Sequence, residues 1–232
     1  MKTIGLIGGM SWESSLEYYR IINETAKELL GELHSAKSIM YTFDFDEIEI
    51  LQREGKWKEL SERVTEIALK LEHAGADMII ICTNTTHIVA DEVQRKISIP
   101  LIHIADSTAK KIIELSMKKV GLLGTKFTME EAFYKDRLAE KYELDVIIPK
   151  EKDRQIIHDI IYKELVLGQI KQTSKQKVIK MVEYLEANGA EGIILGCTEI
   201  PLLIKQEDVD IRLFDTTMIH ARSAVKYAIN EK

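Results

Sequence analysis

The two cysteines of the chain lie in different sequence surroundings. Cys197 follows the apolar run 193–195 and a glycine, and it precedes Thr198-Glu199-Ile200-Pro201, a pattern typical of a helix start. A thiol at a helix N-terminus lies in a positive potential that lowers its pKa, and the thiolate is the reactive form of cysteine. The sequence therefore favours a reactive thiol at Cys197, although structural cysteines also occur at strand ends.

A repeat within the chain indicates which residue is the counterpart of Cys197. Residues 74–85 align without a gap on residues 188–199, and residues 4–8 resemble residues 120–124 at nearly the same separation. Both pairs therefore belong to one duplication. The alignment places Thr83, and not Cys82, opposite Cys197. Because side chains alternate between the faces of a strand, we expect Cys82 to face away and to be a buried, structural thiol.

Four hydroxyl or amide side chains occupy the same turns, namely Asn84, Thr85, Thr125 and Thr198. Each lies at a predicted helix start, where backbone N–H groups point outward. Together they are a suitable set of donors for a carboxylate. Taken singly, each is more often a helix N-cap.

Short apolar runs alternate with helical periodicity along the chain. Helical spacing marks residues 57–73 and 156–167. Apolar runs bounded by Gly, Asn, Asp or Pro predict strands at residues 4–7, 38–43, 78–81, 101–104, 120–123, 146–148, 192–195 and 212–214. This alternation predicts an α/β fold of two pseudo-symmetric, flavodoxin-like (Rossmann-like) domains with parallel sheets.

The expected domains are residues 1–98 plus 207–232, and residues 99–206. The second half has its repeated elements by about residue 205, so we expect the strand near Leu213 and the helix 218–229 to return to the first half. Ligands of open parallel sheets lie beyond the carboxyl ends of the strands. Since the four turns lie at such ends, the active site is expected between the two domains.

Composition excludes several classes of protein. The 232 residues are 45% hydrophobic and 30% charged, which is ordinary for a globular protein that buries a core. The formal net charge of −6 repels polyanions, so no nucleic-acid partner is expected. We see no signal peptide and no apolar run of about 18 residues, and we therefore expect a cytoplasmic protein without membrane segments.

The sequence also lacks the common cofactor and metal patterns. It has no G-x-G-x-x-G with its acidic partner and no Walker A motif, so a nicotinamide or P-loop site is not expected. The histidines lack metal-ligand spacing, and no metal site is predicted. We expect surface or capping roles for them, with His87 as a candidate supporting residue; they are His34, His73, His87, His103, His158 and His220.

Three separated motifs resemble one family of enzymes. Residues 4–14 read Ile-Gly-Leu-Ile-Gly-Gly-Met-Ser-Trp-Glu-Ser, residues 82–85 read Cys-Thr-Asn-Thr, and residues 195–200 read Leu-Gly-Cys-Thr-Glu-Ile. In this order they resemble the aspartate/glutamate racemases, which are cofactor-independent, and the likeness covers essentially the whole chain. The resemblance implies a small amino-acid substrate between two α/β domains, commonly a homodimer, and no pyridoxal phosphate or other cofactor.

The resemblance also implies roles for single residues. Most of the family has two cysteines that face the substrate α-carbon from opposite sides, whereas this chain has Thr83 at the first position and Cys197 at the second. It is therefore most similar to the Thr/Cys branch described as L-aspartate/glutamate-specific racemases. Substrate contacts are implied for Met10, Gln52, Thr83, Asn84, Thr85, Thr125 and Glu164.

The implied mechanism has two proton-transfer groups. Cys197, as thiolate, would take the α-proton of the L-enantiomer, and Thr83 would protonate the opposite face. A hydroxyl is a much poorer acid and base than a thiol, whose reference pKa is about 8.5, so a slow reaction is expected. Two alternatives stay open: a single-cysteine decarboxylase of the arylmalonate type, and a catalytically silent protein that binds acidic amino acids.

Overall fold

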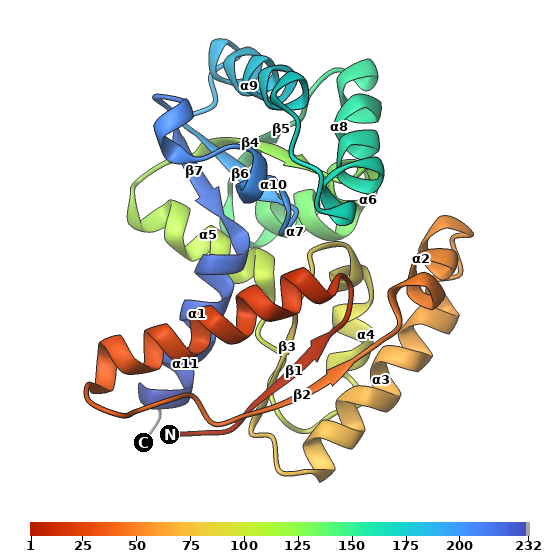
Figure 1. Ribbon diagram of the computed structural model, residues 1–232, viewed down its shortest axis with the longest axis vertical. Coiled ribbons are helices and arrows are strands. Elements are labelled where there is room, and N and C mark those ends of the chain that lie inside the picture. The colour runs from red at the N-terminus through yellow and green to blue at the C-terminus, as the bar shows by residue number, and fades with distance from the viewer. Residues whose placement is uncertain (231–232) are drawn as a thin grey trace. The chain divides into compact units, whose positions relative to one another are not determined.

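In the computed structural model, which describes residues 1–230, strands and helices alternate as the periodicity predicts (Figure 1). The chain forms two units, one of Met1–Ile104 with the C-terminal segment from Thr217, and one of Ala105–Thr216. The boundaries between the two units therefore come after residues 104 and 216, whereas we expected them after residues 98 and 206. None of the helices within residues 1–230 is long and apolar enough to cross a membrane.

The first unit has three layers built on a parallel sheet. Its strands, in the spatial order β2-β1-β3, are β1 (Ile4–Gly8), β2 (Ser38–Thr42) and β3 (Met78–Ile81). One face of the sheet packs on α1 (Trp12–Leu30) and α11 (Thr216–Asn230). The other face packs on α2 (Phe45–Arg53), α3 (Trp57–His73) and α4 (Ala90–Gln94). Between β3 and α4 lies the 3-10 helix η1 (Thr85–Val89).

The second unit has a four-stranded parallel sheet in the order β5-β4-β6-β7. Its strands are β4 (Lys119–Gly124), β5 (Asp145–Ile147), β6 (Gly192–Gly196) and β7 (Arg212–Asp215). Its helices are α5 (Ile104–Glu114), α6 (Lys126–Glu130), α7 (Ala132–Tyr142), α8 (Glu151–Lys163), α9 (Gln172–Ala187) and α10 (Ile200–Leu203), with 3-10 turns η2 (Leu165–Leu167) and η3 (Gln206–Asp208). The α/β class with two parallel sheets is therefore confirmed.

The two repeated halves of the sequence pair their strands in the same register. Ile4 lies opposite Met78 in the first sheet, and Val120 lies opposite Gly192 in the second. One step further along, a glycine of each central strand lies opposite an isoleucine. A Cβ on Gly5 would lie 2.7 Å from Cδ1 of Ile79, and a Cβ on Gly121 would lie 2.6 Å from Cδ1 of Ile193. The two halves therefore use the same packing of isoleucine over glycine.

Two strand predictions need correction. The strand near Leu213 was expected to return to the first half, but β7 pairs in parallel with β6, where Leu213 lies opposite Ile193. The reason is local space: a Cβ on Gly192 would lie only 2.5 Å from the Phe214 ring, so the glycine makes room for this ring. The run 101–104 forms only a single bridge from Leu101 to Ile79 before α5 begins.

One helix prediction also differs from the structure. The helical pattern 156–167 belongs to α8, which starts earlier and ends at Lys163, and to the separate turn η2. Glu164, between them, has non-helical backbone angles (φ −130°, ψ −64°), which interrupt the helix. In contrast, the helix predicted at residues 57–73 matches α3.

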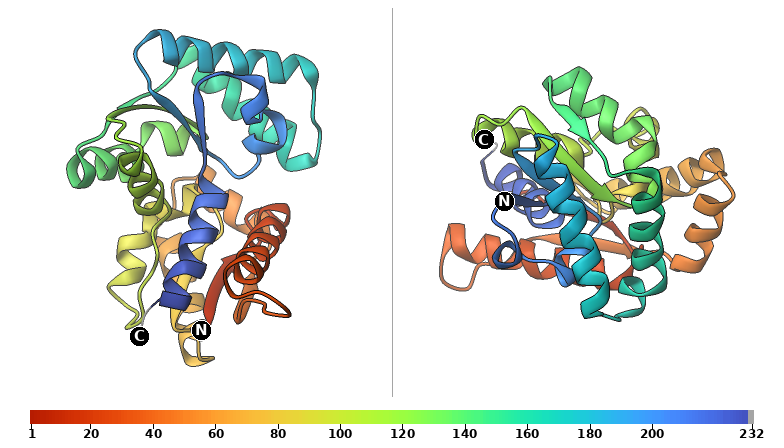
Figure 2. Two further views of the ribbon diagram at one scale, coloured as in Figure 1. Left: turned by 90° about the vertical axis from the view of Figure 1, so that its left-hand side faces the viewer. Right: turned by 90° about the horizontal axis from the view of Figure 1, so that it is seen from above.

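The chain re-enters the first unit through α11, whose last turn lies beside the start of β1 (Figure 2). The backbone N–H of Lys2 donates to the carbonyl of Ala228 at 2.9 Å. Ala221, Ala224 and Val225 pack with α1 on the same face of the sheet. This helix therefore completes the core of the first unit. The predicted return of the helix 218–229 to the first half is confirmed, in contrast to that of the strand near Leu213.

The surface or capping roles expected for the histidines hold for only some of them. His34 and His73 are exposed, and His158 caps α6 by accepting from the Lys126 N–H at 3.3 Å. His87, His103 and His220 are instead buried together in the first unit, with ring centroids of His87 and His103 4.6 Å apart. The expected surface position is therefore wrong for these three side chains, although His87 accepts from the N–H of Ile104, the first residue of α5.

Burial of His220 predicts a pH-dependent stability. Because burial lowers the pKa of His220 to about 4, the unfolded chain binds a proton here below about pH 6.5 while the folded chain does not. Stability attributable to this group is unchanged above that pH and is lost as the pH falls toward 4. We expect the free energy of unfolding to fall by about 2 kcal/mol between about pH 7.5 and pH 5.

Urea unfolding at both pH values measures this loss, and His220→Gln should remove it because the amide does not titrate. His34→Gln is the matched control, since the His34 side chain is exposed. An equal pH dependence in the wild-type and His220→Gln chains would contradict the assignment.

Candidate functional site

The turn after β1 is held by backbone packing. Gly9 has φ +84°, and a Cβ here would overlap the backbone of Phe43, so a larger residue does not fit. The Gly9 N–H donates to Oγ of Ser15 at 2.7 Å. Oγ of Ser14 donates to the carbonyl of Cys82 at 2.6 Å, which ties the start of α1 to the end of β3. The turns after β1 and β3 are therefore both hydrogen-bonded to the start of α1.

Cys82 and Thr83 have different surroundings, as the register predicts. Cys82 is fully buried among the apolar residues that pack on α1 and α11, and burial raises the pKa of its thiol well above the ordinary range. The predicted burial of Cys82 is confirmed, and its structural role stays a prediction. Thr83 is half-buried, and its hydroxyl makes no hydrogen bond to any residue that the structure describes.

Two residues with predicted substrate contacts are joined through a third. Nε2 of Gln52 donates to Oγ1 of Thr86 at 3.2 Å, and that hydroxyl donates to Sδ of Met10 at 3.3 Å. All three side chains are buried. Gln52 and Met10 therefore lie close together beside η1, and Thr86, which the sequence did not single out, links them. Only its position next to Thr85 could have suggested it.

Asn84 and Thr85 are also buried, at the start of η1. The Asn84 side chain makes no capping bond, whereas its carbonyl accepts from the His87 N–H at 3.0 Å. The first unit thus brings Met10, Gln52, Asn84 and Thr85 to the carboxyl end of its sheet.

In the second unit, Cys197 is paired with an acidic residue. Sγ of Cys197 donates to Oε2 of Glu199 at 2.9 Å, and Oγ1 of Thr198 donates to the same oxygen at 2.8 Å. Cys197 and Glu199 are buried, with 8% and 5% of their surfaces exposed. Glu199 was not among the predicted site residues, although its place two residues after the cysteine was visible in the motif.

Burial and the acidic neighbour determine the acidity of Cys197. Burial raises the pKa of the Cys197 thiol well above its ordinary range, and the carboxylate charge and hydrogen bond of Glu199 raise it further. Hydrogen bonds from the backbone N–H groups of Thr198 and Glu199 lower it, as expected at a helix start, but they are the weaker effects. The predicted lowering of this pKa is therefore wrong. The short α10, which follows, contributes too little positive potential to reverse these effects.

Two further predicted residues of the second unit have partners of their own. Oγ1 of Thr125 accepts from the Thr128 N–H at 3.2 Å, so Thr125 is the N-cap of α6. Glu164 accepts from Oγ of Ser174 at 2.6 Å, and this bond, with the nearby Lys171 at 3.3 Å, lowers the pKa of Glu164. Glu164 is thus an ionised side chain between α8 and α9.

The two proposed proton-transfer residues have equivalent positions in their sheets. Ile81 lies opposite Ile7, and Leu195 lies opposite Leu123; Thr83 and Cys197 each come two residues later. Because both sheets are parallel, both residues lie just beyond the carboxyl ends of their strands. The structure therefore reproduces, in each unit, the register that the sequence repeat predicted.

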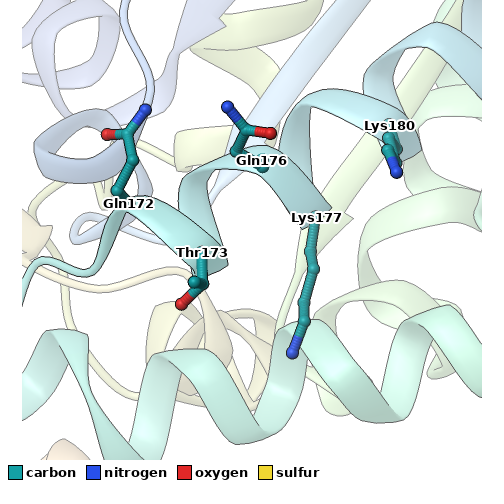
Figure 3. Close-up of a pocket in the computed structure, with 5 residues that line it drawn as sticks. All are labelled: Gln172, Thr173, Gln176, Lys177 and Lys180. Carbon is teal, nitrogen blue, oxygen red and sulfur yellow. The ribbon is translucent and has the colours of Figure 1, made fainter.

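A surface hollow of about 300 Å³ lies on α9 and contains none of these residues (Figure 3). All of its lining side chains come from that one helix: Gln172, Thr173, Gln176, Lys177 and Lys180. A single helix face does not enclose a small molecule. Within residues 1–230, no group of three His, Cys, Asp or Glu side chains is placed to hold a metal ion.

Comparison with known proteins places the chain in a family. The sequence profile described as "Asp/Glu/Hydantoin racemase" matches residues 7–224. The chain belongs to this family. Among solved structures, a candidate Asp/Glu racemase from Yersinia pestis is 50% identical, with a TM-score of 0.94 over 99% of this chain and all of that one.

Two further relatives are less similar to the chain than the Yersinia pestis protein. An aspartate racemase homologue from Pyrococcus horikoshii OT3 is 38% identical, with a TM-score of 0.85 over 98% of this chain and 99% of the other. The broad specificity amino-acid racemase RacX of Bacillus subtilis (strain 168) is 25% identical over 224 residues, which are 96% of each chain. Together they support an amino-acid racemase.

The pair of Cys197 and Glu199 gives a prediction for this racemase. In a Cys82→Ala chain, where Cys197 is the remaining thiol, ultraviolet absorbance of the thiolate should appear only above the ordinary thiol pKa of about 8.5. Glu199→Gln should lower the midpoint, because it removes the negative charge that opposes the thiolate.

The matched control is Glu207→Gln, which changes an exposed carboxylate of the same unit. It should leave the midpoint in place. A Glu199→Gln midpoint that is unchanged or higher would refute the electrostatic role of Glu199.

Proposed function

We propose that this racemase acts on L-aspartate, L-glutamate or both, without a cofactor, with Cys197 and Thr83 as its two proton-transfer residues. Racemisation removes the α-proton on one face of the substrate and returns a proton on the other. Cys197, as thiolate, takes the α-proton of the L-enantiomer, and the Thr83 hydroxyl protonates the opposite face. The family resemblance also leads us to propose a cytoplasmic homodimer.

The equivalent register of Thr83 and Cys197 is the observation that carries this proposal. A two-base reaction needs one group from each side of the α-carbon. A duplicated fold supplies such a pair when the same position of each half carries a group able to transfer a proton. Thr83 and Cys197 fill that position, whereas the buried Cys82 does not.

Glu199 provides a place for the thiol proton. With Sγ and Oε2 2.9 Å apart, the proton of Cys197 can pass to the carboxylate as the thiolate forms. A thiol with a raised pKa is also a stronger base once it is deprotonated, and the α-proton of an amino acid is a very weak acid. Glu199 thus accounts for how a buried, weakly acidic thiol acts as the base.

The remaining predicted residues serve substrate binding. Donors at the strand ends, Asn84, Thr85, Thr125 and Thr198, are proposed to hold the carboxylates and stabilise the charge that develops on the α-carbon. The ionised Glu164 suits the substrate ammonium group. Met10 and Gln52, joined through Thr86, complete the set of proposed contacts. One methylene changes binding by only about 1 to 3 kcal/mol, so acceptance of both acidic amino acids is reasonable.

Hydrogen exchange in deuterium oxide tests the role of Cys197. Proton NMR follows the α-hydrogen of L-aspartate and of L-glutamate in separate incubations. Cys197→Ser should slow exchange by about a hundredfold or more, because serine is a much weaker acid and base than cysteine. Cys82→Ala should exchange at about the wild-type rate. Near wild-type exchange by Cys197→Ser would remove that residue from the mechanism.

The role of Thr83 can be tested with a substrate analogue whose reaction needs only the base on the L face. In an L-β-chloro amino acid, removal of the α-proton forms a carbon–carbon double bond as the β-carbon–chlorine bond breaks and chloride leaves. Thr83→Val should lower racemisation by about a hundredfold while chloride release continues, since the valine has no proton to give. Thr83→Ser, which keeps the hydroxyl, should retain both reactions. Full racemisation by Thr83→Val would exclude Thr83 as the second group.

The same assays separate the alternatives. Carbon dioxide release from a disubstituted malonate, without exchange of aspartate or glutamate, would indicate a decarboxylase. Binding of L-aspartate by calorimetry without exchange would indicate a silent binder. Because enantiomers have equal free energies, kcat/KM must be equal in the two directions, so one-way conversion would also exclude racemisation.

A further inference from the structure

Three buried imidazole rings form a cluster, and one of them, that of His87, bonds to the turn that carries Thr83. His87 belongs to η1, His103 precedes α5, and His220 belongs to α11, and their exposed fractions are 2%, 5% and 0%. The ring centroid of His87 lies 4.6 Å from that of His103 and 5.6 Å from that of His220, with edge contacts in both cases. Two other segments of the chain thus pack against the His87 ring.

Both nitrogens of His87 have backbone partners. Nδ1 lies 2.7 Å from the carbonyl oxygen of Thr83, and Nε2 lies 3.3 Å from the backbone nitrogen of Ile104. A carbonyl only accepts and a backbone N–H only donates, so Nδ1 carries the proton and Nε2 does not. The ring is therefore neutral, in one tautomer, and a second proton would break the bond to Ile104.

The partner at Nε2 lies where the chain leaves the first unit. Ile104 is the last residue of that unit and the first of α5. Two residues earlier, the carbonyl of Ile102 accepts from Nε2 of His220 at 2.7 Å, while Nδ1 of His220 pairs with the Tyr18 hydroxyl at 2.8 Å. His87 therefore joins the outgoing segment to the turn of Thr83, and His220 joins the same segment to Tyr18 of α1.

The orientation of Thr83 depends on its main chain. Its hydroxyl has no hydrogen-bond partner among residues 1–230, and a β-branched side chain has few rotamers, so the direction of Oγ1 follows the backbone. The carbonyl of Thr83 is held by the ring of His87. We infer that His87 is a positioning residue that fixes the direction of the Thr83 hydroxyl toward the substrate; this role rests on the proposed function.

A displacement of this hydroxyl has a specific chemical consequence. Misplacement of a reacting group by about 1 Å can slow a reaction by about a hundredfold. Protonation by Thr83 would be slowed, whereas proton removal by Cys197, on the other unit, would not. Loss of racemisation with retention of chloride release from the L-β-chloro probe is therefore the signature of the role of His87, and general destabilisation does not produce it.

Two amide substitutions separate the two bonds of His87. His87→Asn places an N–H donor near the position of Nδ1 and loses the acceptor for Ile104. His87→Gln places an acceptor near the position of Nε2 and loses the donor for Thr83. We expect racemisation to fall by about tenfold or more in His87→Gln but much less in His87→Asn, with chloride release near the wild-type rate in both.

A matched control comes from α3. Nδ1 of His73 lies 2.8 Å from the carbonyl of Leu69, the same i, i−4 arrangement as in His87, but on the exposed surface. His73→Gln should leave both reactions unchanged. In a Thr83→Val background, His87→Gln should add no further loss of racemisation, because the hydroxyl that it positions is absent.

Parallel losses of racemisation and chloride release, equal effects of the two amides, or additive losses in the double variant would overturn the role of His87. A wild-type chain that performs neither reaction would overturn the proposed function and this role with it.

Nitrogen-15 NMR of the histidines tests the two hydrogen bonds of His87 independently of activity. A neutral ring protonated at Nδ1 is expected for His87, and a ring protonated at Nε2, or at both nitrogens at neutral pH, would refute it.

Discussion

Strand register is the constraint on which the candidate site depends. In each sheet β1 or β4 pairs in parallel with the strand that leads to a proposed proton-transfer residue, Thr83 or Cys197, and the two pairings match. Side chains change face with every residue, so a shift by one position would replace Thr83 with Cys82. The packing of isoleucine over Gly5 and Gly121 fixes this register. The proposed chemistry therefore depends on an arrangement of the core.

The electrostatics of Cys197 reverse a common assumption about reactive thiols. The backbone N–H groups of Thr198 and Glu199 lower the pKa of the Cys197 thiol and so favour the thiolate, but burial and the Glu199 carboxylate raise this pKa more strongly. The resting group is consequently a thiol that donates to a carboxylate. In the proposed mechanism, such a pair keeps the sulfur in its less reactive protonated form until substrate is present, and the Glu199 carboxylate accepts the proton when the base is needed. This arrangement suits removal of a weakly acidic proton.

Sequence reasoning predicted the features that depend on local pattern. Strands, their end turns and the burial of Cys82 follow from apolar runs and from alternation, and the internal repeat added the register. What it missed depends on contacts between distant segments. β7 joined the second sheet because Phe214 packs over Gly192. The hydrogen bond between His220 and Tyr18 joins α11 to α1, and the bond from Gln52 to Thr86 joins α2 to η1. Periodicity carries no information about such pairs.

The central claim is that Thr83 and Cys197 act on one carbon atom from two sides. A crystal structure with bound L-aspartate or L-glutamate tests it most directly. We predict that Oγ1 of Thr83 and Sγ of Cys197 lie on opposite faces of the substrate α-carbon, each at about 3.5 Å from it. A substrate bound with either atom well out of reach of the α-carbon, or with both on the same face, would contradict the account.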